Sequence, residues 1–210
     1  MTAVQLFAVT GSHGQRGTFG RASDVVVFRD LAAIVKDVPY VAPPVGALRD
    51  YREVVESVFR EQAVLPAPPG VVFRDRDVLT QWLELHYVTL LDALAFVEDR
   101  AVARVVVAPA NGVSGVSRAA GEAEDVVARR EASEAALRDA LQVLRRHAVA
   151  TLPVVGDGGH PASASFLVDR TRWGQFSEAV AEESDRLSGF ALRLSGPWPP
   201  YDFIRMQFTN

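Results

Sequence analysis

Cysteine is absent from the 210-residue chain, and lysine occurs only once, at Lys36. The lack of cysteine excludes disulfides, thiolate nucleophiles, thiolate zinc sites and cysteine-ligated iron–sulfur clusters, and it is consistent with a reducing compartment. Basic side chains are also fewer than acidic ones, 22 against 26, and no face rich in lysine and arginine is evident. We therefore expect neither nucleic acid nor a lipid membrane as a partner.

Long apolar runs are missing as well. No stretch reaches the roughly 18 apolar residues that a membrane-spanning helix needs, and no basic leader precedes the short apolar run at the start. We therefore expect a cytoplasmic protein. Hydrophobic residues make up 49% and charged residues 23% of the chain, which is typical of folded proteins with a proper core.

The first half of the sequence predicts a mixture of strands and helices. Alternating residues predict a strand over 3–10, and two short β-branched runs at 24–28 and 31–35 predict a hairpin. Apolar residues spaced by three and four predict an amphipathic helix from Ala47, and a second from Asp75 or Asp77 to Val97. The apolar residues of this second helix cover more than half of its circumference, so we expect it to be packed on two sides.

The second half reads helix, strand, strand, helix, strand. Placing the apolar run 101–108 in front of it gives β-α-β-β-α-β, the ferredoxin-like order. The predicted elements are a strand over 101–108, a helix over 118–148, hairpin strands over 151–155 and 163–168, a helix over 177–187 and a strand over 190–194. We therefore expect an α+β protein of two small domains, with residues 1–108 as the first, 109–117 as a linker and 118–210 as the second.

No set of residues with catalytic or ligand-binding spacing emerges. The glycine-rich segment after the first strand has five residues between Gly11 and Gly17, and Arg16 stands where a phosphate-binding loop needs lysine. Ser114 lies in GVSG, which lacks the second spacer of a nucleophile elbow. The four histidines have no ligand spacing, and His86 is interpreted as a residue at the edge of a core. We expect no catalytic residue, no cofactor and no metal.

The segment GPWPPYDF, residues 196–203, combines three prolines with aromatic side chains directly after a predicted strand. Proline restricts the backbone, so Trp198 and Tyr201 are presented on a stiff frame. Trp198 fills the core of the second domain, anchors a partner, or does both, with the indole half buried against Leu192 and Leu194 and its outer edge facing the partner. The candidate partner-binding residues are Pro197, Trp198, Pro199, Pro200 and Tyr201.

The same region resembles a known family. SFLVDRTRWGQFSEAV followed by LRLSGPWPPYDFI is similar to the C-terminal signature of the gas vesicle protein F/L family, which ends in GPWPPYSF. VLPAPPGVVFRDRDVLTQWL, residues 64–83, resembles the family's vLPlrFGtvf stretch and the helix after it. Here Ala67, Pro68 and Pro69 replace the Leu-Arg-Phe that the family tends to have.

The resemblance implies an accessory or minor structural protein of gas vesicles, located in the cytoplasm and on the vesicle. Its partners would be gas vesicle shell protein A and other accessory vesicle proteins, and no catalysis is implied. Exposed apolar patches would keep the hydrophobic shell subunit soluble or nucleate its polymerisation. The alternatives are a ferredoxin-like regulatory module that binds a small ligand in a pocket between the domains, and, more remotely, an enzyme with an unfamiliar site.

Overall fold

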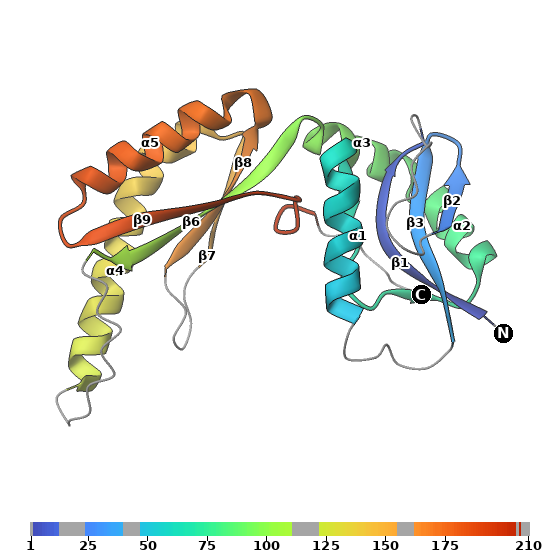
Figure 1. Cartoon of the computed structure of the whole chain (residues 1–210), viewed down its shortest axis with the longest axis horizontal. Helices are drawn as coiled ribbons and strands as arrows, with labels where there is room; N and C mark the ends of the chain where they lie inside the picture. The colour runs from blue at the N-terminus through green and yellow to red at the C-terminus, as the bar shows by residue number, and fades with distance from the viewer. Residues whose placement is uncertain are drawn as a thin grey trace. The chain divides into compact units, whose positions relative to one another are not determined.

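A computed structural model of the chain describes residues 2–12, 24–39, 47–110, 122–154, 162–204 and 206. The chain divides into two compact units (Figure 1). The first unit contains residues 1–99 together with residues 199–210, and the second contains residues 100–198. The fold is α+β, as the sequence predicts, because each unit combines an antiparallel sheet with helices.

The first unit is built on the strand order β2-β3-β1-β4, with β5 also paired to β1. Every described pairing is antiparallel, and Leu6 and Ala8 flank an irregularity in the register of β1 and β3. Its elements are β1 (Thr2–Gly11), β2 (Asp24–Phe28), β3 (Leu31–Pro39), α1 (Ala47–Glu61), β4 (Val64–Pro66), β5 (Val72–Phe73), α2 (Arg76–Leu85) and α3 (Tyr87–Val97).

The sheet of the first unit is covered by helices on both faces (Figure 1). Val4, Leu6 and Val9 of β1 pack with the buried residues of α2 and α3. Phe7 points to the other face, where its ring stacks on Tyr51 of α1 with the centroids 6.3 Å apart. The apolar alternation of β1 thus serves two layers, which explains why both of its faces are buried.

The second unit has the strand order β7-β8-β6-β9, again antiparallel. Its chain order of β-α-β-β-α-β is the ferredoxin-like arrangement expected from the sequence. Its strands and α-helices are β6 (Arg100–Pro109), α4 (Glu122–Leu144), β7 (Ala150–Val154), β8 (Ser163–Asp169), α5 (Trp173–Arg186) and β9 (Phe190–Trp198).

The core of the second unit lies between the sheet and its two helices. Phe166 of β8 and Phe176 of α5 are fully buried, and their ring centroids are 5.1 Å apart. Leu137, Ala140 and Leu144 of α4 join the same cluster. The short side chain of Ala140 permits close approach of the helix to the sheet, as the alanine-rich pattern suggests.

The division of the chain differs from the boundary expected after residue 108. Strand β6 pairs with β8 and β9 along its length, so residues 100–108 belong to the second unit. Residues 199–210, expected in the second domain, belong to the first. Most of the expected linker, residues 111–117, lies outside the described part of the chain.

Several expected elements also differ in detail, and the helix expected over 177–187, for example, begins at Trp173. The helix predicted to reach Val97 is two helices, because the backbone at His86 leaves helical geometry (φ −101°, ψ 11°) between α2 and α3. Asp75 caps the first of them, accepting a hydrogen bond from the Val78 N–H at 2.9 Å. Strand β9 does not stop at Leu194 but continues to Trp198, because a register shift allows the strand to pair again with β6 beyond Ser195.

Candidate functional site

The proline- and tryptophan-containing segment is divided between the two units. Gly196, Pro197 and Trp198 end β9 in the second unit, whereas the residues from Pro199 onward belong to the first. Pro199 and Pro200 are buried, while Pro197 is exposed, and Trp198 and Tyr201 are 42% and 36% exposed. The five candidate partner-binding residues therefore do not form one uniform surface.

Trp198 lies on the side of β9 opposite to the core leucines. It is in register with Val102, and its indole N–H donates a hydrogen bond to Ser195 Oγ at 3.3 Å. Leu194 is in register with Val105, whose side chain belongs to the core under the helices. The expected packing of the indole against Leu192 and Leu194 is therefore not observed. The strand register places the indole on one face of the sheet and the two leucines on the other.

Tyr201 joins an aromatic cluster in the first unit. Its ring centroid lies 6.4 Å from that of Tyr51, which in turn stacks on Phe7. The Tyr51 hydroxyl donates a hydrogen bond to the carbonyl oxygen of Ala67, so this buried phenol is satisfied. Residues 199–203 form a turn, with the N–H of Tyr201 bonded to the carbonyl of Pro199 at 2.8 Å. The C-terminal segment is therefore a structural part of the first unit.

The cluster predicts a loss of stability at alkaline pH. Burial, and secondarily the charge of Glu56, raise the pKa of Tyr201 to about 12, and burial also raises the pKa of Tyr51. A phenol whose pKa is raised in the folded state stabilises it fully below the ordinary value of 10 and loses that contribution as the pH rises toward 12. Melting temperature between pH 8 and 11.5 should fall more steeply for the wild type than for Tyr201→Phe. Parallel curves would contradict this assignment.

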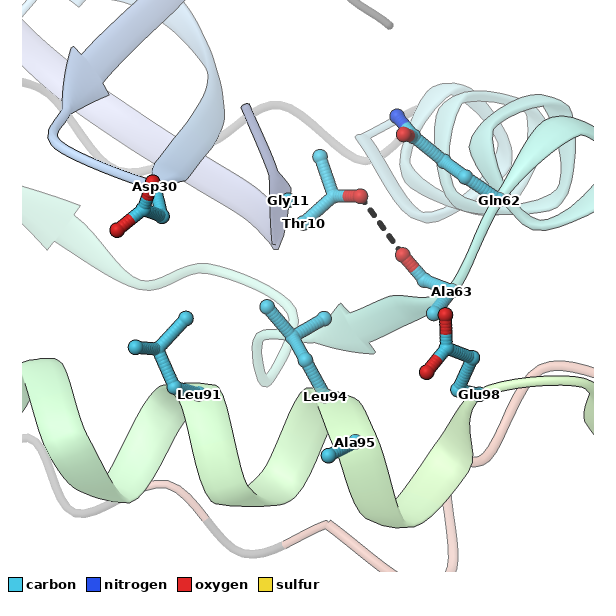
Figure 2. A pocket seen from close by; sticks show the side chains of 9 residues that line it. All are labelled: Thr10, Gly11, Asp30, Gln62, Ala63, Leu91, Leu94, Ala95 and Glu98. Atoms are coloured by element: carbon cyan, nitrogen blue, oxygen red, sulfur yellow. Dashed lines mark hydrogen bonds between the residues drawn. The ribbon is translucent and has the colours of Figure 1, made fainter. Parts of the chain in front are cut away.

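A second candidate site is an open pocket in the first unit, with a volume of about 420 Å³. Figure 2 shows Leu91, Leu94 and Ala95 of α3 along one side, with Asp30 and Glu98 apart from each other at the rim. Opposite α3, Thr10 donates a hydrogen bond to the carbonyl oxygen of Ala63 at 2.7 Å, which joins the end of β1 to the chain before β4. We call this pocket the α3 groove. Its remaining lining residues are Gly11 and Gln62.

The polar groups around the α3 groove are mainly acidic. Asp30 accepts a hydrogen bond from the Tyr87 hydroxyl, and this bond raises the pKa of Tyr87, which keeps the phenol protonated. The guanidinium of Arg29 lies over the rings of Phe28 and Tyr87, 5.2 and 5.3 Å from their centroids. Asp30 is thus already engaged by a phenol with a cation nearby, and the described lining of the groove holds no nucleophile paired with a base.

The sequence does not reveal the α3 groove, because its lining comes from four separate places: β1, the turn between β2 and β3, the connection between α1 and β4, and α3 with its C-cap. One signal was available: the apolar residues of the 75–97 segment cover too much of its circumference for packing on one side. The structure packs Leu90, Leu94 and Val97 into the core and leaves Val88 exposed. Within the described chain, α3 therefore packs against the sheet on one side, and the expected packing on a second side is not seen.

The described residues hold no group of three or more His, Cys, Asp or Glu side chains that could bind a metal ion. Among those residues, no helix is long and apolar enough to cross a membrane. His86 lies at the junction of α2 and α3, with its ring centroid 5.0 Å from that of Trp82. Ser114 and the predicted glycine loop beyond Ser12 lie outside the described residues.

Comparison with solved structures shows the same fold over the whole chain. The crystal structure of the gas vesicle protein GvpF from Anabaena sp. PCC7120 matches with a TM-score of 0.78 at 13% identity, covering 100% of this chain and 99% of that one. GvpF from Microcystis aeruginosa matches with a TM-score of 0.75 at 12% identity, covering 98% and 100%. At these identities the likeness concerns the fold alone.

Sequence comparison shows the family. Gas vesicle protein F from Streptomyces sp. (strain CB03234) is 31% identical over 208 residues, covering 86% of this chain and 87% of that protein. The family model described as gas vesicle synthesis protein GvpL/GvpF matches residues 4–114 and 108–205, and so includes both units. The resemblance at GPWPPYDF is thereby confirmed, and the chain belongs to the GvpL/GvpF family of gas vesicle synthesis proteins.

Proposed function

We propose that this protein is an accessory or minor structural protein of gas vesicle assembly that binds gas vesicle shell protein A and other accessory vesicle proteins. The observation that carries the proposal is the family match, which spans both units of the chain. Partner binding is further supported by large apolar side chains left exposed on both units, among them Leu85, Val88 and Trp198. The protein acts in the cytoplasm and on the vesicle, without catalysing a reaction.

The proposed mechanism is to keep the hydrophobic shell subunit soluble, or to nucleate its polymerisation. Exposed apolar side chains can cover apolar surface on an unassembled subunit, and so lower its tendency to aggregate. Co-expression of the tagged chain with shell protein A tests this directly. We expect shell protein to be recovered in the soluble fraction and to be captured with the tag, and its absence from the captured material would contradict the proposal.

Trp198 is the residue we propose as the anchor for a vesicle protein, with Tyr201 and the prolines Pro197, Pro199 and Pro200 holding the segment in shape. Trp198→Ala should weaken capture of shell protein, or of another vesicle protein, by at least about 2 kcal/mol, the scale of interface hot spots. Because the indole is 42% exposed, the free energy of unfolding should fall by less than about 1.5 kcal/mol.

Val149→Ala is the matched control, because Val149 is a 44% exposed apolar residue of the same unit. It should change neither capture nor stability by more than about 0.5 kcal/mol. Capture is measured on purified variants, and unfolding by urea titration of the same samples. A loss of about 3 to 5 kcal/mol in stability with unchanged capture would instead make Trp198 a core residue.

A further inference from the structure

Helix α3 is apolar on more of its surface than the described chain covers. Its sequence, YVTLLDALAFV, buries Leu90, Leu94 and Val97 against the sheet. Val88, which lies one turn before Leu91 on the same side of the helix, is 67% exposed. Thr89 and Asp92 give α3 a polar, exposed side, but Val88, Leu91 and Ala95 recur at helical spacing and extend its apolar surface beyond the part packed on the sheet.

The α3 groove provides a place for that neighbour. Leu91, Leu94 and Ala95 form its apolar side (Figure 2). Leu91 and Glu98 are seven positions apart, which corresponds to about 10 Å, or two turns, along a helix. This length suits a short segment of protein that places two or three apolar side chains on α3, as helix-in-groove complexes do.

Charge indicates what kind of segment fits. Glu98 caps the C-terminus of α3 and is followed by Asp99, and α3 has no basic residue in its last turn. The C-terminus of a helix carries partial negative charge and is ordinarily accompanied by basic side chains, so two acids at this position make the region strongly negative. In the described part of the chain, no basic side chain forms an ion pair with Glu98.

Asp30 adds a second carboxylate at the rim of the α3 groove, held by the Tyr87 hydroxyl. The groove therefore combines an apolar side with two acids on its rim, of which Asp30 lies near the guanidinium of Arg29 and Glu98 does not. This is complementary to an amphipathic segment with basic side chains, whereas an acidic segment would be repelled.

We propose that the α3 groove binds an amphipathic segment of another gas vesicle protein, with apolar side chains on Leu91, Leu94 and Ala95 and a lysine or arginine beside Glu98. This inference rests on the proposed function for the identity of the partner, and names a surface distinct from the Trp198 segment. Its ligand is a protein segment of defined chemistry: apolar at positions three or four apart, and basic at an adjoining position.

Binding of the intact chain to shell protein A and to each other vesicle protein, all prepared as soluble fusions, tests the inference. For at least one partner, Glu98→Lys should weaken binding by about tenfold or more, because it places like charges together. Ala95→Gln should have a similar effect, because it puts an amide on the apolar side of the groove. Both positions are exposed, so thermal melting should show that the variants remain folded.

Two control variants make the same chemical changes elsewhere. Glu53→Lys reverses a charge at an exposed position of α1, and Ala181→Gln alters an exposed position of α5. Neither should change binding by more than about twofold. A partner variant in which the basic residue is replaced by glutamate should bind the wild type poorly and bind Glu98→Lys with its affinity restored.

The outcomes separate this inference from the proposed function. Binding of vesicle proteins that is unchanged by both Glu98→Lys and Ala95→Gln would overturn the role of the α3 groove and leave the proposed function standing. Failure of the wild-type chain to bind any vesicle protein would overturn both. Equal losses of binding affinity in the groove variants and in the control variants would also overturn the role of the α3 groove, because the effect of the substitutions would then be nonspecific.

Discussion

Removal of residues 199–210 should strongly destabilise the unit formed by residues 1–99, although the deletion lies at the opposite end of the chain. Pro199 and Pro200 are buried, and Ile204 and Met206 pack against the core formed by β1, β3, α2 and α3. Ile204 and Met206 are partly buried, so exposing them together with the two buried prolines should cost about 2 to 5 kcal/mol, below the sum for large side chains that are fully buried at about 1.5 to 3 kcal/mol each. That is a large part of the stability of an ordinary domain.

Amide hydrogen exchange locates this effect. The truncated chain should lose protection in β1 and β3, while β6 and β8 of the second unit keep theirs. Deletion of residues 207–210 alone is the matched control, because it retains Ile204 and Met206, and it should leave both units protected. Full protection of β1 and β3 in the longer truncation would show that the C-terminal segment does not stabilise the first unit.

Gly196→Ala should produce a comparably large loss of stability in the second unit. The backbone φ of Gly196 is +128°, a conformation that residues other than glycine rarely adopt. An added Cβ would lie 2.6 Å from the carbonyl oxygen of Val102 and 2.8 Å from Cη2 of Trp173. Because Val102 is on the neighbouring strand β6, relief requires movement of backbone as well as of the Trp173 side chain. We expect a loss of about 3 kcal/mol or more.

Gly174→Ala gives the contrasting case for urea unfolding measurements. Gly174 lies in α5, and an added Cβ would meet nothing within 4 Å. Alanine is preferred over glycine in helices, so this change should raise the free energy of unfolding by about 0.5 to 1 kcal/mol. A Gly196→Ala variant as stable as the wild type would contradict the geometry described for the end of β9.

The ferredoxin-like order of the second unit was predictable because each of its elements has a local signal. Alternation in residues 190–194, the β-branched run at 101–108 and the alanine-rich helix all depend on residues close in sequence. The boundary between the two units has no such local signal. Whether strand 101–108 joins the elements before it or after it depends on pairing with β8 and β9, and no local pattern records that pairing.

The same limit applies to the candidate sites. GPWPPYDF was identifiable as an unusual segment, yet its division at Trp198 and Pro199 depends on contacts made by Tyr201 with residues 150 positions earlier. The α3 groove combines the turn at Asp30 with a helix some 60 residues later, so only the excess of apolar residues on α3 pointed toward it. The sequence does not reveal the break at His86, because apolar periodicity continues on both sides of it.

The most direct test of the proposed role is a count of gas vesicles by electron microscopy, in cells that carry a complete set of vesicle genes except the one for this protein. We expect few or no vesicles without the gene, and normal numbers when the wild-type chain is supplied. The Trp198→Ala and Glu98→Lys variants should restore fewer vesicles than the Val149→Ala and Glu53→Lys controls, at equal protein levels. Vesicles of normal number and shape in the absence of the protein would contradict a role in their assembly.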